Sequence, residues 1–355
     1  DLDEPPPLPE PVVCGFRPVA NTTPTMTEAD MEDWKKIREP DEPKPKIDSV
    51  KPFNVMVAQS RGVKRLGVLR MDVDDLGDLF RYRLDSGLAR VSALSAALAL
   101  FFEGRVGRLC DDFNDPAWRR QEGIAADDEP DRGSVYCIYS GGDDLFIVGS
   151  WHLLPHLARR ISDDLARYSG QNPYVHLSAG ISLHGAKFPL YQAAEAAHEE
   201  LERAKDREGK AALGFLEQVV AWEYADTLFD LVDKLDGYLR EPTRLPRAIL
   251  QTLQQLYVQY DAGITERRRR KRSGQFRYDP WVWRSMYQLT RIAKQVRGDD
   301  DEKAIREWVC DLRDNMLQGI DLPVNTGGRA IERVGLAARW TQLLIRKERD
   351  NGTRE

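Results

Sequence analysis

Acidic residues gather at two places in the first half of the chain. Three acids, Asp72, Asp74 and Asp75, stand within four residues, and a second pair, Asp143 and Asp144, follows a Ser-Gly-Gly sequence. Clustered carboxylates repel one another and lose solvation as they approach. A divalent cation removes that cost, and Mg²⁺ is typically held by one or two carboxylates together with substrate phosphates. The pattern therefore predicts a site for Mg²⁺, or Mn²⁺, beside a phosphate-bearing substrate.

The residues before the second acidic pair suit a close approach to phosphates. Gly141 and Gly142 accept positive φ angles and carry no side chain, and Ser140 adds a hydroxyl. Each acidic motif also has an ordinary interpretation, because Gly and Asp are common in hairpin turns and Asp is common at helix N-caps. The metal-site interpretation is favoured because both motifs occur in one chain, each beside an apolar segment.

Two lysines extend the same hypothesis. Lys205 ends a predicted helix over residues 190–205, and Lys210 opens a short apolar segment after it. Lysines just past a helix could reach the β- and γ-phosphates of a nucleotide. The alternative is that each lysine complements the helix dipole.

The segments that must position these residues alternate between strand and helix patterns. Apolar segments predict strands over 65–73, 134–139, 145–150 and 175–183, with a Gly-rich hairpin between the second and third. Helical spacing of apolar residues predicts helices over 76–80, 91–109, 153–168 and 190–205. The order predicts an α+β fold, a ferredoxin-like palm of the nucleotidyl cyclase or polymerase type, with an antiparallel sheet and helices on one face. Residues 111–131 are polar and are predicted to form a surface insertion.

Composition divides the chain into three parts. Residues 1–60 are rich in Pro and acids, which predicts a linker or the remnant of an upstream domain. Residues 61–222 hold the palm. Residues 223–355 show only helical patterns, which predicts an all-helical bundle after the palm. Because residue 1 is Asp, we expect the sequence to be a C-terminal portion of a longer chain.

The overall composition limits the classes of function. The net charge of −6 argues against a general nucleic-acid binder, and the longest apolar segment, residues 91–102, is too short to span a membrane. The four cysteines form no CxxC pair, which disfavours a zinc site and favours a cytoplasmic location. The basic segment Arg267–Arg272 is either a solvated loop or a contact for phosphates or an acidic partner.

The motifs resemble those of one known family. The segment LGVLRMDVDDLG over residues 66–77 is similar to the first palm strand of the large subunit of type III CRISPR effector complexes. The segment YSGGDDLF over 139–146 is similar to the GGDD hairpin of that family, and LSAGIS, FPL, AK and GK continue the match in order. The resemblance runs from about residue 65 to residue 222, and the helical remainder is similar more loosely.

The resemblance implies roles for individual residues. Asp72 and Asp143 would bind the catalytic magnesium, assisted by the carbonyl of Val73, and Asp144 would bind a second metal or help deprotonate the attacking 3′-hydroxyl. Lys205 and Lys210 would contact the triphosphate, beside the hairpin whose Ser140, Gly141 and Gly142 are predicted above to admit it.

The resemblance also implies an activity and partners. Such subunits join ATP into a cyclic oligoadenylate second messenger when their complex binds target RNA, so the implied partners are other effector subunits, crRNA, target RNA and ATP. Two alternatives remain open. The chain could be a scaffold subunit with a relict palm, because the family's other palm is not recognisable here. It could also be a GGDEF-like diguanylate cyclase, although the second Asp of the motif and the helical part argue against this.

Overall fold

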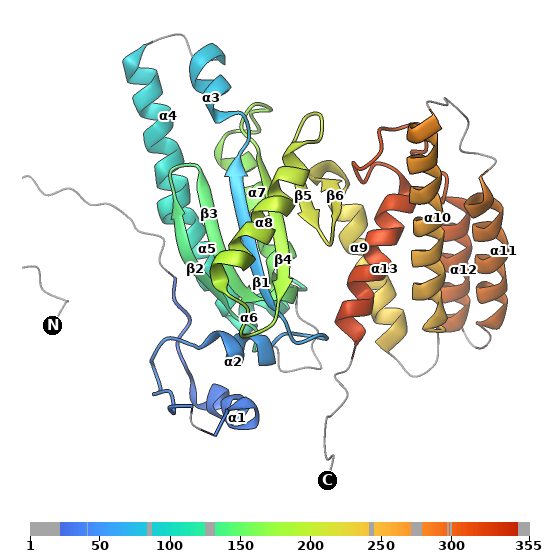
Figure 1. The fold of residues 1–355 in the computed structure, drawn as a ribbon, viewed down its shortest axis with the longest axis horizontal. Helices are drawn as coiled ribbons and strands as arrows, with labels where there is room; N and C mark the ends of the chain where they lie inside the picture. The colour runs from blue at the N-terminus through green and yellow to red at the C-terminus, as the bar shows by residue number, and fades with distance from the viewer. Residues whose placement is uncertain are drawn as a thin grey trace, which may run out of the picture.

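The computed structural model of the chain describes residues 22–40, 42–83, 87–124, 132–240, 245–270, 279–296, 298 and 300–346. Figure 1 shows a sheet covered by helices, beside a part made only of helices. This arrangement confirms the predicted α+β palm followed by a helical bundle. The chain passes from the last strand into the first helix of the bundle at Trp222.

One six-stranded sheet forms the palm. Its strands are β1 (Leu66–Val73), β2 (Val135–Gly141), β3 (Asp144–Ser150), β4 (Leu177–His184), β5 (Ala212–Phe215) and β6 (Gln218–Ala221). The strand order is β2-β3-β1-β4-β5-β6, which places β1 at the centre. Neighbouring strands are antiparallel except β4 and β5, which are parallel. The prediction of an antiparallel sheet is therefore wrong for this pair, because α8 (Leu190–Lys205) supplies the crossover that a parallel pair requires.

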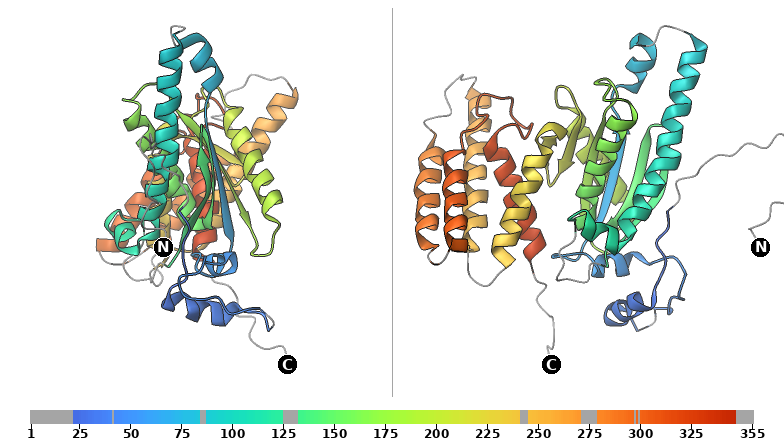
Figure 2. Two further views of the ribbon diagram at one scale, coloured as in Figure 1. Left: turned by 90° about the vertical axis from the view of Figure 1, so that its left-hand side faces the viewer. Right: turned by 180° about the vertical axis from the view of Figure 1, so that it is seen from behind.

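Helices cover both faces of the sheet, as the two views in Figure 2 show. On one face Val68 of β1 packs with Ala193 and Ala197 of α8. On the other face Leu69 and Met71 join a larger core with α5 (Val106–Asn114) and α7 (Leu154–Tyr168). The prediction of helices on one face is thus wrong. Since β1 is apolar at successive positions, both of its faces must be buried.

The segment between β1 and β2 is helical for most of its length. It comprises α3 (Leu76–Asp78), α4 (Leu88–Leu100), α5, α6 (Pro116–Gln121) and π-helical turns at Leu79–Arg83 and Phe101–Arg105. The described part of the predicted surface insertion is largely exposed, but Phe113 and Arg119 anchor it to the core because both are fully buried. The Arg119 guanidinium donates to the Phe113 carbonyl, which satisfies the buried charge locally. Residues 125–131 of that segment lie outside the described residues.

The N-terminal segment contains ordered helices where a linker was predicted. α1 (Glu28–Ile37) and α2 (Phe53–Ala58) enclose a small core of Met26, Met31, Trp34 and Val55. A capping box begins α1, because the Thr27 hydroxyl accepts from the Asp30 amide at 3.3 Å and the Asp30 carboxylate accepts from the Thr27 amide at 2.8 Å. The high content of proline obscured these short helices in the sequence.

Replacing Thr27 with Ala is expected to lower the free energy of unfolding by about 1 kcal/mol, because one N-cap hydrogen bond is lost. Urea denaturation of the full chain measures the change. Thr27→Ser is the matched control, since it retains the hydroxyl and should remain close to the wild type. An equal loss in both variants would show that the methyl group, and not the cap, matters.

The helical part comprises α9 (Trp222–Arg240), α10 (Ala248–Arg270), α11 (Pro280–Gln295), α12 (Asp300–Asp314) and α13 (Ala330–Ile345). It shares one hydrophobic core with the palm. The indole of Trp340 packs edge-on against Phe215 of β5 at 5.4 Å and against Phe229 of α9 at 5.1 Å, measured between ring centroids. None of the described helices is both long enough and apolar enough to cross a bilayer.

The basic segment begins inside a helix. Residues 267–270 form the last turn of α10, so the prediction of a loop is wrong for these residues. Arginine is a good helix former, and cations are favoured at a helix C-terminus. The Arg267 guanidinium pairs with Asp279 at the start of α11, and Arg269 pairs with Glu266. Residues 271 and 272 lie outside the described residues.

Each outer strand of the sheet donates a backbone hydrogen bond to another segment. At the β2 edge the amide of Cys137 donates to the carbonyl of Thr22 at 3.0 Å. At the β6 edge the amide of Ala221 donates to the carbonyl of Thr326 at 2.8 Å, in the loop before α13. Cys137 is fully buried, as the sequence predicts for a small core residue.

Candidate active site

The end of β1 and the turn between β2 and β3 meet at one end of the sheet (Figure 1). Asp72 stands directly opposite Asp144 in the register of β1 and β3. Residues opposite each other in an antiparallel pair project to the same face. The amide of Val73 donates to the carbonyl of Asp143 at 3.0 Å, which fixes the tip of the turn against β1. The structure thus brings the three predicted acids together.

Electrostatic repulsion between these acids is present in the structure. Burial raises the pKa of Asp143, and the negative charges of Asp72 and Asp144 raise it further. Asp72 forms an ion pair with the ammonium of Lys205, whereas Asp143 and Asp144 have no ion-pair partner among the described residues. The hairpin therefore carries an excess of negative charge.

The donor atoms suit a magnesium ion that is bound together with a nucleotide. Within the described part of the chain, no group of three or more His, Cys, Asp or Glu side chains is arranged to hold a metal ion. Mg²⁺ in nucleotide sites needs only one or two carboxylates, because phosphates and water complete its octahedron. Asp72 and Asp143 supply such a pair, and the excess negative charge of the hairpin fits a cation.

The tip of the hairpin uses one of its glycines for backbone conformation. Gly142 has a φ of +67°, and a Cβ added there would meet nothing within 4 Å. This glycine is therefore required by the left-handed backbone and leaves open space beside it. Ser140 was predicted to offer its hydroxyl to the phosphates, but in the structure this hydroxyl is buried and donates to the carbonyl of Phe102 at 2.7 Å. The hydroxyl points into the core and is not grouped with the acids.

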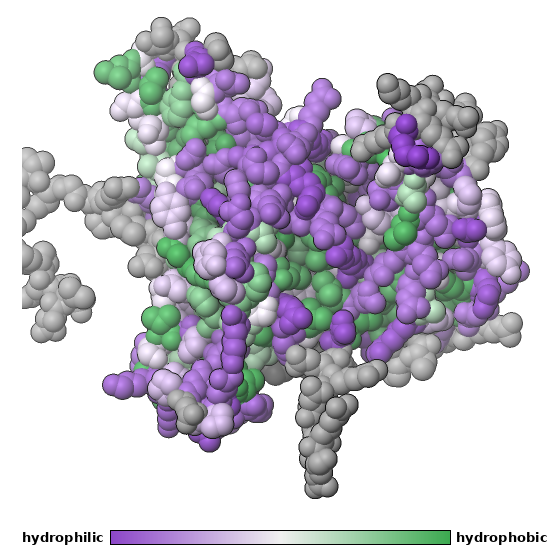
Figure 3. Space-filling model, viewed as in Figure 1, coloured by the Kyte–Doolittle hydropathy of each residue, from purple (hydrophilic) through white to green (hydrophobic). Residues whose placement is uncertain are grey.

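Both predicted lysines reach the acidic end of β1. Lys205 ends α8 and pairs with Asp72, and the ammonium of Lys210 lies 2.5 Å from the Asp75 carboxylate. Hydrogen bonding to Asp75 raises the pKa of Lys210, so this lysine stays charged. Figure 3 shows hydrophilic side chains gathered over α8 and the segment that follows it. These cations stand where a triphosphate beside the hairpin would meet them.

Sequence reasoning missed the separate role of Asp74 and the position of Tyr139. Asp74 is fully buried and hydrogen-bonds to the His176 imidazole at 2.8 Å and the Ser178 hydroxyl at 3.0 Å. Its partners lie more than 100 residues away in the sequence, so no local pattern could have revealed them. The Tyr139 hydroxyl donates to the carbonyl of Gly141 at 3.0 Å and so braces the hairpin tip.

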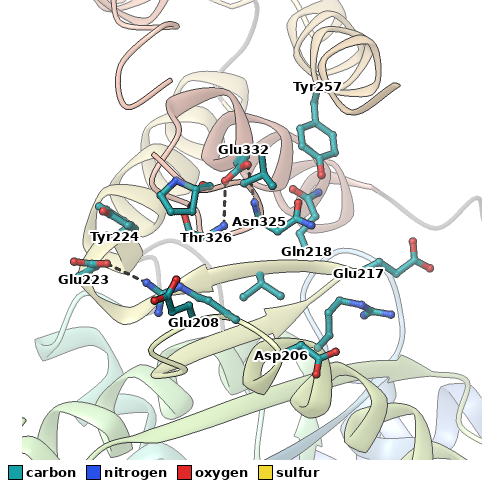
Figure 4. Close-up of a pocket in the computed structure, with 15 residues that line it drawn as sticks. Asp206, Glu208, Glu217, Gln218, Glu223, Tyr224, Tyr257, Asn325, Thr326 and Glu332 are labelled. Carbon is teal, nitrogen blue, oxygen red and sulfur yellow. Dashed lines mark hydrogen bonds and ion pairs between the residues drawn. The ribbon is translucent and has the colours of Figure 1, made fainter. Parts of the chain in front are cut away.

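A cavity of about 580 Å³ lies between the palm and the helical part (Figure 4). It contains none of the predicted site residues. The buried carboxylate of Glu332 shapes one wall, because it accepts from the amides of Asn325 at 2.9 Å and Gly327 at 3.0 Å and from the Tyr260 hydroxyl at 2.8 Å. This cavity is therefore separate from the acidic end of β1.

Replacing Glu332 with Gln is expected to lower the free energy of unfolding by about 2 kcal/mol, because the amide NH₂ would face backbone donors in a buried place. Thermal and urea denaturation measure the loss. Glu223→Gln, at the exposed side of the same cavity, is the control and should change stability little. Equal stability of the Glu332→Gln variant and the wild type would contradict the assigned hydrogen bonds.

A comparison with protein families bears on this site directly. Residues 65–214 match the family model of the Cas10/Cmr2 second palm domain. This part of the chain is similar to the Cas10/Cmr2 second palm domain. The matched part includes β1, the Gly-Gly-Asp-Asp hairpin, α8 and the segment with both lysines. The match confirms the resemblance to the large subunit of type III CRISPR effector complexes.

Individual relatives agree with the family match. The chain is similar to a CRISPR system single-strand-specific deoxyribonuclease Cas10/Csm1 (subtype III-A) of Methanocaldococcus jannaschii, with 37% identity over 147 residues, or 41% of this chain and 18% of the relative. A protein of the same description from Mycobacterium tuberculosis is 26% identical over 227 residues, or 61% of this chain and 27% of the relative. The chain thus spans less than a third of the length of these relatives.

Solved structures confirm the fold. Csm1 of T. onnurineus superposes with a TM-score of 0.58 at 21% identity, and the match covers 87% of this chain and 41% of that one. A Csm1–Csm4 subcomplex of the type III-A interference complex gives a TM-score of 0.59 at 20% identity, over 93% of this chain and 40% of that one. Both matches extend beyond the palm into the helical part.

Proposed function

We propose that the chain belongs to the large subunit of an RNA-guided type III CRISPR effector complex and joins ATP into cyclic oligoadenylate. One observation carries this proposal. The register that sets Asp72 opposite Asp144, with Asp143 at the turn, gathers three carboxylates beside two lysines. Such a set of charges suits phosphoryl transfer, in which positioning and charge neutralisation supply most of the catalysis.

Each residue has a part in the proposed reaction. Asp72 and Asp143 would hold Mg²⁺ together with the carbonyl of Val73, and the ion would supply polarisation of the α-phosphate and activation of the attacking hydroxyl. Asp144 would accept the proton of the 3′-hydroxyl or hold a second ion.

The lysines would hold the other end of the nucleotide. Lys205 would leave Asp72 and bind the triphosphate, and Lys210 would do the same from Asp75. An ammonium that already neutralises a carboxylate can exchange it for phosphate oxygens, which form charge-assisted hydrogen bonds of the same kind. The open space beside Gly142 would admit the phosphates.

Structures similar in fold support the choice of nucleotide and product. A Csm1–Csm4 cassette has been solved with AMPPNP and with cA4, and these structures match the chain with TM-scores of 0.57. At about 20% identity these matches speak for the fold, so the substrate remains part of the proposal. Other effector subunits, crRNA and target RNA are the proposed partners.

The test is synthesis by the assembled complex. The full chain, purified with the subunits and crRNA that accompany it, is incubated with Mg²⁺, complementary RNA and either ATP or GTP, and products are identified by mass spectrometry. Cyclic oligoadenylate that depends on target RNA supports the proposal. A cyclic diguanylate product would indicate a GGDEF-like enzyme instead. No product, in a complex that still binds target RNA, would indicate a scaffold.

A further inference from the structure

The carboxylate of Asp74 joins three separate segments of the palm. Its side chain is fully buried one residue beyond the end of β1. One oxygen, Oδ2, hydrogen-bonds to the imidazole of His176 at 2.8 Å, to the hydroxyl of Ser178 at 3.0 Å and to the amide of Ala211 at 3.0 Å. Because the side chain has no exposed surface, it cannot touch a nucleotide.

The backbone that Asp74 holds at Ala211 has an unusual conformation. Gly209, Lys210 and Ala211 are consecutive residues with φ angles of +81°, +47° and +45°. Left-handed conformations are unfavourable for residues with a Cβ, and they persist only where surrounding contacts enforce them. Strained backbone of this kind is concentrated at ligand clamps and active sites.

The amide of Lys210 donates to the Arg207 carbonyl at 3.0 Å within the turn at residues 209–211, and three further contacts enforce this turn. The guanidinium of Arg207 donates to the Lys210 carbonyl at 2.5 Å, and the amide of Trp222 donates to the Ala211 carbonyl at 3.0 Å. The third contact is the hydrogen bond from the Ala211 amide to Asp74. Only the third of these contacts holds the backbone of the turn from the segment that carries Asp72; the same segment also holds the Lys210 ammonium through Asp75. The third contact therefore sets the position of the turn relative to the acidic end of β1.

We propose that Asp74 is a positioning residue that fixes the left-handed turn at 209–211, and through it Lys210, at the distance from β1 that a triphosphate requires. This inference rests on the proposed function for its ligand. Asp74 and Asp72 lie two residues apart and have different roles. Asp74 holds the segment that contains Lys210, and Asp72 would bind the metal and the substrate. The second oxygen of Asp74, Oδ1, is buried without a hydrogen-bond partner, so the carboxylate depends on its Oδ2 contacts.

The first variant that tests this proposal is Asp74→Asn. The side chain keeps its shape and its oxygen can still face the three donors, but the negative charge that strengthens these hydrogen bonds is lost, and the amide nitrogen takes the buried place of Oδ1, which has no hydrogen-bond partner. We expect the dissociation constant of a non-hydrolysable ATP analogue with Mg²⁺ to rise about tenfold, the equivalent of one hydrogen bond to a charged group. We also expect faster amide hydrogen exchange over residues 209–211. Both are measured on the full chain.

Two substitutions of Ala211 test the turn without altering Asp74. Ala211→Val places a β-branched residue at a positive φ angle and should weaken analogue binding as Asp74→Asn does. Ala211→Gly removes the strain, so it should leave binding unchanged and should restore part of the affinity when combined with Asp74→Asn. Ala211→Val decides the matter by itself if the Asp74→Asn variant does not fold.

Each outcome separates this inference from the proposed function. Normal analogue affinity in a folded Asp74→Asn variant, or in Ala211→Val, would overturn the positioning role, whatever their melting temperatures. The positioning role would also be overturned if Asp74→Asn lost the same affinity for the analogue with and without Ala211→Gly. Glycine at the turn does not relieve a purely structural defect. If the wild type binds the analogue but forms no cyclic product, the proposed reaction fails and the positioning role stands.

Discussion

Replacing Asp143 with Asn is expected to reduce the synthesis of cyclic oligoadenylate by at least about 100-fold, since one metal ligand and its charge are worth several kcal/mol in the transition state. The physical basis is the charge excess at the hairpin, where Asp72 and Asp144 raise the pKa of Asp143. An amide retains the shape of the turn but binds Mg²⁺ weakly. Product formed per complex, at saturating ATP and target RNA, is the measurement.

The control for this variant is Asp78→Asn. Asp78 is an exposed acid in α3, close in the sequence to Asp72 but outside the group of three carboxylates. Its removal changes the net charge equally and should leave synthesis near the wild-type rate. Full activity of the Asp143→Asn variant would contradict the assigned metal site, and equal losses in both variants would indicate a general effect of charge.

Replacing Gly214 with Ala is expected to lower the free energy of unfolding by about 3 kcal/mol, because the added methyl group overpacks the contact between β5 and α8. A Cβ at this position would stand 2.0 Å from the carbonyl oxygen of Glu200, in the backbone of α8. β5 cannot move away from α8 easily, because it is paired with β4 and β6 on its two sides. Urea denaturation of the full chain measures the change.

Gly237→Ala is the matched control. Gly237 is exposed within α9, and a Cβ there would meet nothing within 4 Å. The same substitution should therefore raise stability by about 0.5–1 kcal/mol, because alanine favours helix. A stable Gly214→Ala variant would show that α8 can move away from the sheet, which would alter the position of Lys205 as well.

The sequence predicted the grouping of the three acids better than the surroundings that support it. Asp72, Asp143 and Asp144 were recognisable because each acidic motif directly follows or interrupts an apolar strand, and strand ends are fixed by local pattern. The ion pair of Lys205 with Asp72 follows from the length of α8, which is also a local property, whereas the pair of Lys210 with Asp75 depends on the turn after α8. The placement of Ser140 was not predictable, because its partner Phe102 belongs to a different helix.

The errors have a common cause in long-range packing. The parallel pairing of β4 with β5 depends on where α8 docks, and α8 docks where two glycines, Gly180 and Gly214, leave room for its backbone. The helices near residues 28–37 and 53–58 are short and are stabilised by contacts with each other, so their periodicity was weak. The domain boundaries at residues 60 and 222 stay a prediction, since palm and bundle share one core.

The backbone contacts at the two edges of the sheet bear on whether a further strand could be added there. An edge strand with unpaired backbone groups can pair with a strand of another molecule, either a bound peptide or a second copy of the same protein. In this palm the Thr22 carbonyl accepts the Cys137 amide of β2, and the Thr326 carbonyl accepts the Ala221 amide of β6. A strand that paired with these amides would therefore have to displace the segment at Thr22 or the loop at Thr326.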